Sequence, residues 1–237
     1  MKPFPIFALL LFCLLIQEGC TGQLHSQDKI YNFKKQDPNG IGKWFLGREI
    51  AHVMGYQGID WLERNSREEE ENTSALLRNM NLQKNEVIAD IGAGSGYHVF
   101  RIAPLVKKVY AVDIQEEMLQ SINGKLTNVD YNNIETVHSA DSSVYLPKNS
   151  IDKVLMVDVY HEFEFPYEML KSIKQALKPD GEIFLIEYRG EDPSVPIKEV
   201  HKMTEKQAVK ELKFAGFRLK KNVDNLPWQH CMIFIKE

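Results

Sequence analysis

The chain has 237 residues, of which 43% are hydrophobic and 26% are charged, and its formal net charge is −4. This composition excludes a disordered chain, a collagen-like chain and a protein with several membrane spans. The balance of charges does not indicate a nucleic-acid partner. The length allows one large domain whose hydrophobic core needs no disulfides.

The N-terminus has the pattern of an export signal. Lys2 is followed by an apolar run over residues 6–16, which is too short for a membrane-spanning helix. Gly19 and Cys20 come next, and this pair resembles the bacterial lipoprotein signal, in which the cysteine is acylated and becomes the mature N-terminus. We therefore expect a signal peptide over residues 1–19, a lipid anchor at Cys20 that attaches the protein to a membrane, and a place in the cell envelope. A cytoplasmic protein with an unused signal is the alternative.

Two segments are expected between this signal and the main domain. Residues 20–40 are polar and contain a turn sequence at 37–40, which favours a flexible tether. Residues 41–84 carry apolar side chains at helical spacing and predict an N-terminal helical cap. Within this cap, residues 47–54 are expected to form a helix, and the acidic run 68–71 is expected to be a solvated helix face.

From residue 86 onward, the chain alternates short apolar strands with helical stretches. Near-continuous apolar strands of this kind are typical of a parallel sheet that is covered on both faces. We therefore predict an α/β domain over residues 85–237. Its strands are expected at 87–91, 109–112, 134–137, 154–159, 183–186, 217–219 and 232–235.

The most informative motif is the segment 89–96, which reads Ala-Asp-Ile-Gly-Ala-Gly-Ser-Gly. It ends the first strand and opens a helix, so its three glycines let the backbone turn tightly and approach a ligand closely. A dinucleotide site requires a small residue where this chain has Tyr97, which argues against a nicotinamide cofactor. Asp90 suits a cationic ligand better than a phosphate. Ser95 is not a predicted nucleophile, because the G-x-S-x-G pattern is missing around it.

Three aspartates each come at the end of a predicted strand or soon after it. Because such folds bind ligands at the carboxyl ends of parallel strands, Asp113, Asp141 and Asp158 are candidate ligand contacts. Asp113 lies 21 residues after Gly92 and is placed to accept hydrogen bonds from ribose hydroxyls. Asp141 is predicted either to contact an adenine amino group or to act as a cap or turn residue.

Together these motifs resemble the class I S-adenosylmethionine-dependent methyltransferases. The family's first motif matches residues 90–96, its ribose-binding strand matches 109–113, and the segment before its fifth strand matches 177–181. Within this family, the chain most resembles the ubiquinone-biosynthesis-like methyltransferases. It also resembles an uncharacterised bacterial group, and that resemblance does not indicate a substrate. It implies an α/β, Rossmann-like seven-stranded sheet in the order 3-2-1-4-5-7-6, with only strand 7 antiparallel. The cofactor it implies is S-adenosylmethionine, bound by Asp90, Gly92, Ala93, Gly94, Gly96, Asp113, Ile114, Asp141, Ser142 and Asp158.

The resemblance also implies direct in-line attack on a sulfonium methyl group, in which positioning does most of the catalysis. His161 is the best candidate base because an unperturbed histidine titrates near neutrality, and a structural histidine that hydrogen-bonds a loop is the alternative. Glu162 is a candidate to orient His161 or to bind substrate, and a surface carboxylate with neither role is the alternative that residue type favours. Tyr160, Tyr188 and His201 are candidate substrate contacts at the same edge of the sheet. No metal site is predicted, because the two histidines are 40 residues apart and form no close ligand pair.

We therefore expect S-adenosylmethionine-dependent methyl transfer to a small molecule. No basic stripe with interleaved aromatic residues is present, so nucleic acid is not expected as a partner. A lipid-anchored envelope protein that keeps this fold for binding, without turnover, is the alternative. The acceptor atom and the oligomeric state are left open.

Overall fold

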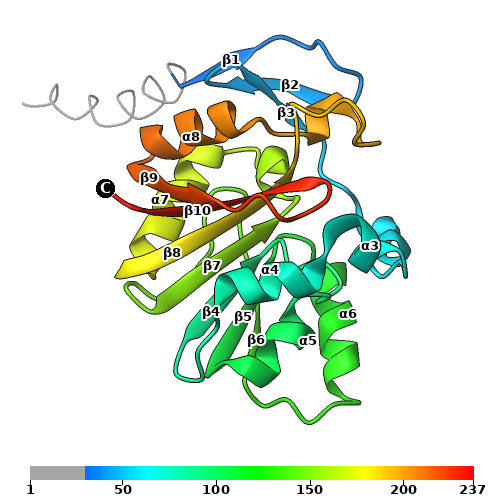
Figure 1. Ribbon diagram of the computed structural model, residues 1–237, viewed down its shortest axis with the longest axis vertical. Helices are drawn as coiled ribbons and strands as arrows, with labels where there is room; N and C mark the ends of the chain where they lie inside the picture. The colour runs from blue at the N-terminus through cyan, green and yellow to red at the C-terminus, as the bar shows by residue number, and fades with distance from the viewer. Residues whose placement is uncertain (1–29) are drawn as a thin grey trace, which may run out of the picture.

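The computed structural model describes residues 30–237, which form a seven-stranded sheet with helices on both faces and a second, small sheet beside it (Figure 1). The predicted signal peptide and lipid anchor lie outside the described residues. None of the helices in residues 30–237 has the length and apolar character that spanning a bilayer requires.

The central sheet has the order β6-β5-β4-β7-β8-β10-β9, which confirms the predicted order and the predicted fold class. Neighbouring strands from β6 to β8 are parallel, whereas β10 is antiparallel to both β8 and β9. Only the last strand along the chain is therefore reversed. The strands are β4 (Val87–Ile91), β5 (Lys108–Asp113), β6 (Ile134–His138), β7 (Ile151–Val157), β8 (Leu177–Tyr188), β9 (Phe217–Asn222) and β10 (Gln229–Lys236).

Side chains of alternate residues in the strands pack into two hydrophobic cores, one on each face of the sheet. In β4, Ala89 and Ile91 join one core, while Ile88 joins the other. Burial on both faces explains why these strands appear in the sequence as near-continuous apolar runs. The first core lies under α7 (Pro166–Ala176) and α8 (Glu205–Phe214), and the second under α4 (Thr73–Met80), α5 (Val99–Ile102) and α6 (Glu116–Leu126).

Residues 30–51 differ from the prediction. They form a three-stranded antiparallel sheet, so the tether over 20–40 and the helical cap over 41–84 are wrong for this stretch. Leu46 and Gly47 both have positive φ, 48° and 98°, and make a two-residue hairpin turn that a helix through Gly47 could not contain. The strands are β1 (Tyr31–Phe33), β2 (Gly40–Phe45) and β3 (Arg48–Ala51).

Short helical segments connect the two sheets and complete the domain. The helical character predicted for the later part of the cap is confirmed from residue 56 onward. The segments between the two sheets are η1 (Tyr56–Gly58), α2 (Ile59–Leu62) and α3 (Arg67–Glu71), followed by α4. Three further short helices, η2 (Ala103–Leu105), η3 (Tyr160–Glu162) and η4 (Glu199–His201), lie within the main domain.

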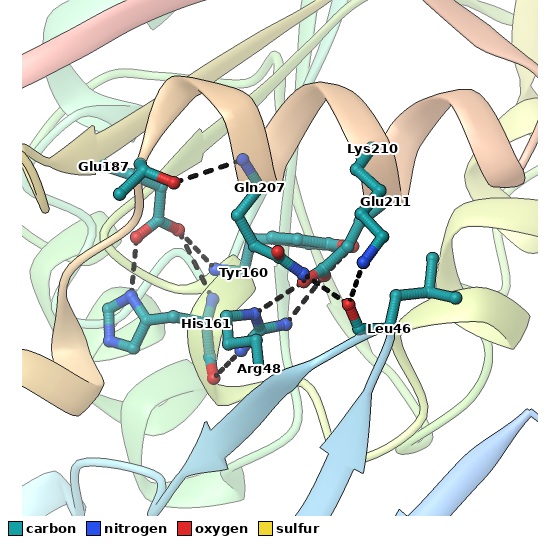
Figure 2. Close-up of polar contacts among 9 residues, drawn as sticks. Leu46, Arg48, Tyr160, His161, Glu187, Gln207, Lys210 and Glu211 are labelled. Atoms are coloured by element: carbon teal, nitrogen blue, oxygen red, sulfur yellow. Dashed lines mark hydrogen bonds and ion pairs between the residues drawn. The ribbon is translucent and has the colours of Figure 1, made fainter.

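The small sheet packs against the outer side of α8 (Figure 1). Phe45 meets Phe214 edge to face, with ring centroids 6.0 Å apart. Arg48 of β3 adds a buried ion pair, in which Nε and Nη2 donate to the Glu211 carboxylate of α8 at 2.8 and 2.9 Å. Its Nη1 also donates to the backbone carbonyl of His161 at 3.0 Å (Figure 2). Arg48 therefore joins the small sheet to the loop that follows β7.

Arg48→Met is expected to lower the free energy of unfolding by about 3–5 kcal/mol, because the Glu211 carboxylate would remain buried without its counter-charge. Urea unfolding followed by circular dichroism measures this loss. Lys220→Met is the matched control, since Lys220 pairs with Glu182 on the surface, and its expected loss is below about 1 kcal/mol. Equal losses in the two variants would contradict the structural role of Arg48.

Candidate functional site

A cavity of about 520 Å³ opens where β4, β5 and β7 end. The ends of these strands line it with Gly92, Asp113 and Asp158. Residues 53–62 and 196–201 supply further walls. Its size and its place at the carboxyl edge of the sheet are typical of a small-molecule site in an α/β fold.

The turn after β4 brings the bare backbone against this cavity. Gly92 and Gly94 have φ values of 72° and 54°, in the left-handed region that glycine adopts readily. A Cβ at Gly92 would lie 2.3 Å from Cγ2 of Val159, and one at Gly94 would lie 2.8 Å from Cδ1 of Leu62. The turn therefore forms a cradle that side chains would fill.

Asp113 fixes this cradle to the end of β5. Its Oδ2 accepts a hydrogen bond from the Gly94 N–H at 2.9 Å, and its Oδ1 accepts one from the Gln115 N–H at 2.9 Å. Each carboxylate oxygen has a second lone pair, so Asp113 retains acceptor capacity for ribose hydroxyls. Burial raises the pKa of Asp113, while these backbone donors oppose the rise.

Most of the predicted site residues do meet at the cavity. Its lining includes Gly92, Gly94, Asp113, Ile114, Asp141, Asp158, His161, Glu162, Tyr188 and His201. Four other predicted cofactor contacts lie outside this lining, namely Asp90, Ala93, Gly96 and Ser142. Ala93 belongs to the hydrophobic core, and Gly96 lies against Phe100 and Ile122.

Tyr160 is not a substrate contact, contrary to the prediction. Its side chain is fully buried, its hydroxyl donates to the Glu211 carboxylate at 2.8 Å, and its ring meets Phe163 edge to face. Burial and the nearby Glu211 raise the pKa of Tyr160 far above its ordinary value. Tyr160 and His161 are neighbours in η3, but Tyr160 points toward α8 while His161 lines the cavity.

Asp158 has an unusual conformation at the cavity. It has a φ of 50°, which is rare for a residue with a side chain. Its Oδ2 accepts a hydrogen bond from Nε2 of Gln229 at 2.6 Å, whereas its Oδ1 is buried with no partner. Burial, together with Glu71 and Glu187, raises the pKa of Asp158 well above its usual range. A cationic ligand group beside the unpartnered oxygen would favour the charged form of Asp158, and S-adenosylmethionine carries both a sulfonium and an ammonium group. The residues present therefore fit the predicted cofactor.

His161 is held by a buried carboxylate. Oε2 of Glu187 lies 2.6 Å from Nδ1 of His161, and Oε1 accepts hydrogen bonds from the N–H groups of Tyr160 at 2.9 Å and of His161 at 3.4 Å (Figure 2). Burial alone would lower the pKa of His161, but Glu187 and Glu162 outweigh it and raise that pKa to about 10. A protonated imidazole cannot accept a proton, so the structure argues against His161 as the general base. Burial and the charge of His161 lower the pKa of His201.

Two polar residues that support or line the cavity wall, Glu71 and Gln115, were not predicted from the sequence. Glu71 was expected on a solvated face but is buried, where it accepts from Arg64 and Arg67 at 2.6 Å and from the Tyr188 hydroxyl at 3.2 Å. The (i, i+4) spacing of Arg67 and Glu71 was the available signal. Gln115 donates from Nε2 to the Met54 carbonyl at 2.9 Å and so holds residues 53–62 over the cavity. No motif marks Gln115, because its partner lies in another part of the chain.

Comparison with known proteins agrees with this geometry. Residues 89–185 match the family model described as "Methyltransferase domain". A methyltransferase-like protein of Schizosaccharomyces pombe is 33% identical over 48% of this chain and 43% of its own length. The chain spans about half the length of the curated relatives it matches.

Solved structures show the same fold. An S-adenosylmethionine-dependent methyltransferase from Aquifex aeolicus superimposes with a TM-score of 0.72, at 24% identity, over 77% of this chain and 98% of that one. The methyltransferase CalH, solved in complex with S-adenosylhomocysteine, gives a TM-score of 0.53 at 19% identity, over 65% of this chain and 52% of that one. Residues 89–185 therefore match a methyltransferase domain, and the chain has the fold of these S-adenosylmethionine-dependent methyltransferases.

Gly92→Ala is expected to weaken S-adenosylmethionine binding by at least about tenfold and to destabilise the fold, because the new Cβ would meet Val159 and φ is positive. Isothermal titration calorimetry and thermal unfolding measure the two effects. Gly124→Ala in α6 is the control, since no heavy atom lies within 4 Å of its added Cβ. This control is expected to bind normally and to gain about 0.5–1 kcal/mol of stability. Unimpaired binding by Gly92→Ala would contradict the cradle.

Asp90 is buried beneath the glycine turn, and its Oδ2 has no partner. Burial raises the pKa of Asp90 to about 7, with Arg67 opposing the rise and Asp113 adding to it. Between pH 4 and 7 the folded protein therefore keeps a proton that the unfolded chain loses, so this residue makes stability fall as the pH rises.

Asp90→Asn removes this titration. The free energy of unfolding of the variant, relative to that of the natural chain, is expected to increase as the pH rises from 4 to 7, by a total on the order of 4 kcal/mol. Above pH 7 this difference is expected to stay constant. Urea unfolding of both proteins without ligand, at a series of pH values, checks the expectation. A constant difference across the series would show that Asp90 titrates normally.

Proposed function

We propose that this chain is an S-adenosylmethionine-dependent methyltransferase that transfers the methyl group directly to a small-molecule acceptor. The observation that carries the proposal is that a single cavity is lined by both the glycine cradle with Asp113 and the polar wall of His161, Glu162 and His201. A cofactor site and a place for an acceptor therefore adjoin, as direct transfer requires.

The chain's own groups have distinct tasks in this proposal. Bound S-adenosylmethionine supplies an electrophilic methyl group on a positively charged sulfur. Asp113 and Asp158 hold the cationic cofactor at the ends of β5 and β7. Trp61 and Leu62 line the cavity from the N-terminal segment and limit the access of water. Catalysis then rests on holding the acceptor in line with the methyl group.

The rest of the lining indicates the kind of acceptor. Phe163, Met169 and Ile197 provide an apolar surface, while Glu162 and Lys198 provide charge. This mixture suits a small molecule with an apolar body and one polar donor atom.

We also propose that the protein acts at the cell envelope. This part of the proposal rests on residues 1–20 alone, which have the pattern of a lipoprotein signal. Cell fractionation, with mass spectrometry of the mature N-terminus, tests it. A soluble protein that retains Met1 would favour the cytoplasmic alternative.

Asp141→Ala in the full chain is expected to weaken S-adenosylmethionine binding about 10- to 100-fold, which corresponds to one hydrogen bond to a charged group. Calorimetric titration measures this change. Asp130→Ala removes an exposed aspartate outside the cavity lining and is expected to leave binding unchanged. Failure of the well-folded natural chain to bind S-adenosylmethionine would contradict the proposed function.

Turnover is tested separately, by following transfer of radiolabelled methyl groups from S-adenosylmethionine into an envelope extract. Label is expected in the small-molecule fraction. Tight cofactor binding with no label in any fraction would favour the binding protein without turnover, and label in protein would overturn the proposed acceptor class.

A further inference from the structure

Two histidines and a glutamate converge on one wall of the cavity. His161 and Glu162 belong to η3, and His201 ends η4, 40 residues further along the chain. The structure brings one ligand atom of each within 4.8 Å of the others. Sequence spacing gave no sign of this group, because the two turns meet only in the folded chain.

The separations of these atoms suit a shared metal ion. Nε2 of His161 lies 3.1 Å from Nδ1 of His201, and Oε1 of Glu162 lies 3.7 Å from each of the two nitrogens. The circle through three points with these separations has a radius of about 2.0 Å, which is close to the bond lengths of zinc to imidazole nitrogen and to carboxylate oxygen. One ion would therefore reach all three atoms without a large movement.

The surroundings resemble those of ligands in known metal sites. Metal-binding histidines usually donate their other ring nitrogen to a carboxylate, which fixes the tautomer. Glu187 does this for His161, at 2.6 Å from Nδ1. An ion that displaces the proton from Nε2 would therefore find this nitrogen already directed toward the group. Oε1 of Glu162 is held by the Met54 N–H at 3.1 Å. The two carboxylates also place negative potential where a cation would lie.

The group is open to the cavity on one side. The side chains of His161, Glu162 and His201 are 3%, 10% and 22% exposed, and all three line the cavity. An ion bound here would thus have protein ligands from behind and free positions toward the cavity, as catalytic metal sites do.

We propose that His161, Glu162 and His201 bind a divalent transition-metal ion whose free positions take an oxygen or sulfur atom of the methyl acceptor. Two imidazole nitrogens and one carboxylate oxygen suit Zn²⁺, Fe²⁺, Co²⁺ or Ni²⁺ rather than Mg²⁺ or Ca²⁺, which prefer sets of oxygen ligands. The role of the ion in binding the acceptor rests on the proposed methyl transfer, whereas the existence of the metal site does not. The acceptor class would then be a hydroxyl or thiol compound.

Titration of the purified, chelator-treated full chain with Co²⁺ tests the site, because Co²⁺ bound by nitrogen ligands absorbs visible light. One Co²⁺ per chain is expected, displaced by Zn²⁺ but not by Mg²⁺. His201→Ala and Glu162→Gln are each expected to weaken binding by at least about tenfold, and Glu187→Gln by about 10- to 100-fold through loss of the support to His161. His52→Ala, which removes an exposed histidine outside the cavity lining, is the matched control and should bind Co²⁺ normally.

Two results would overturn the site: no visible absorption, or absorption that His201→Ala and Glu162→Gln leave unchanged while circular dichroism shows both variants folded. The group would then be a hydrogen-bonded pair of histidines with its carboxylates. A parallel titration with S-adenosylmethionine in the presence of chelator separates this failure from failure of the proposed function, since the cofactor cradle contains none of the three residues.

Discussion

The arrangement of the site depends on one buried carboxylate. Glu187, at the end of β8, has no exposure to solvent, so its charge must be compensated by donors inside the protein. It accepts from the N–H groups of Tyr160 and His161 and binds Nδ1 of His161. These contacts fix the turn after β7, so that His161 lines the cavity while Tyr160 packs toward α8.

The small N-terminal sheet supports the same turn from the other side. Arg48 binds the backbone carbonyl of His161 and the carboxylate of Glu211, which in turn accepts from the Tyr160 hydroxyl (Figure 2). The Leu46 carbonyl accepts from Lys210 of α8 and keeps the hairpin in place. Residues 30–51 are therefore part of the support of the site, and the position of His161 depends on both sheets.

The central sheet was predictable because its signals are local. Short apolar strands, the glycine turn at 89–96 and the aspartate after the second strand each have a physical cause within a few residues. The structure of the N-terminal region was not predictable in this way, because the helical spacing of apolar residues over 47–54 competes with a hairpin turn at Leu46 and Gly47. Tertiary contacts of β2 and β3 with α8 decided in favour of the hairpin.

The sequence by itself determined the alternation of strands and helices, and with it the fold class and the glycine turn. The strand order and the predicted cofactor came from the family that its motifs resemble. Only the tertiary structure decided which polar side chains act together. His161 and His201 are 40 residues apart, and Glu187 comes from a third segment, yet His161 lies within hydrogen-bonding distance of both His201 and Glu187. The physical reason is that a parallel sheet brings the ends of distant strands to one edge, where side chains meet that no local pattern connects.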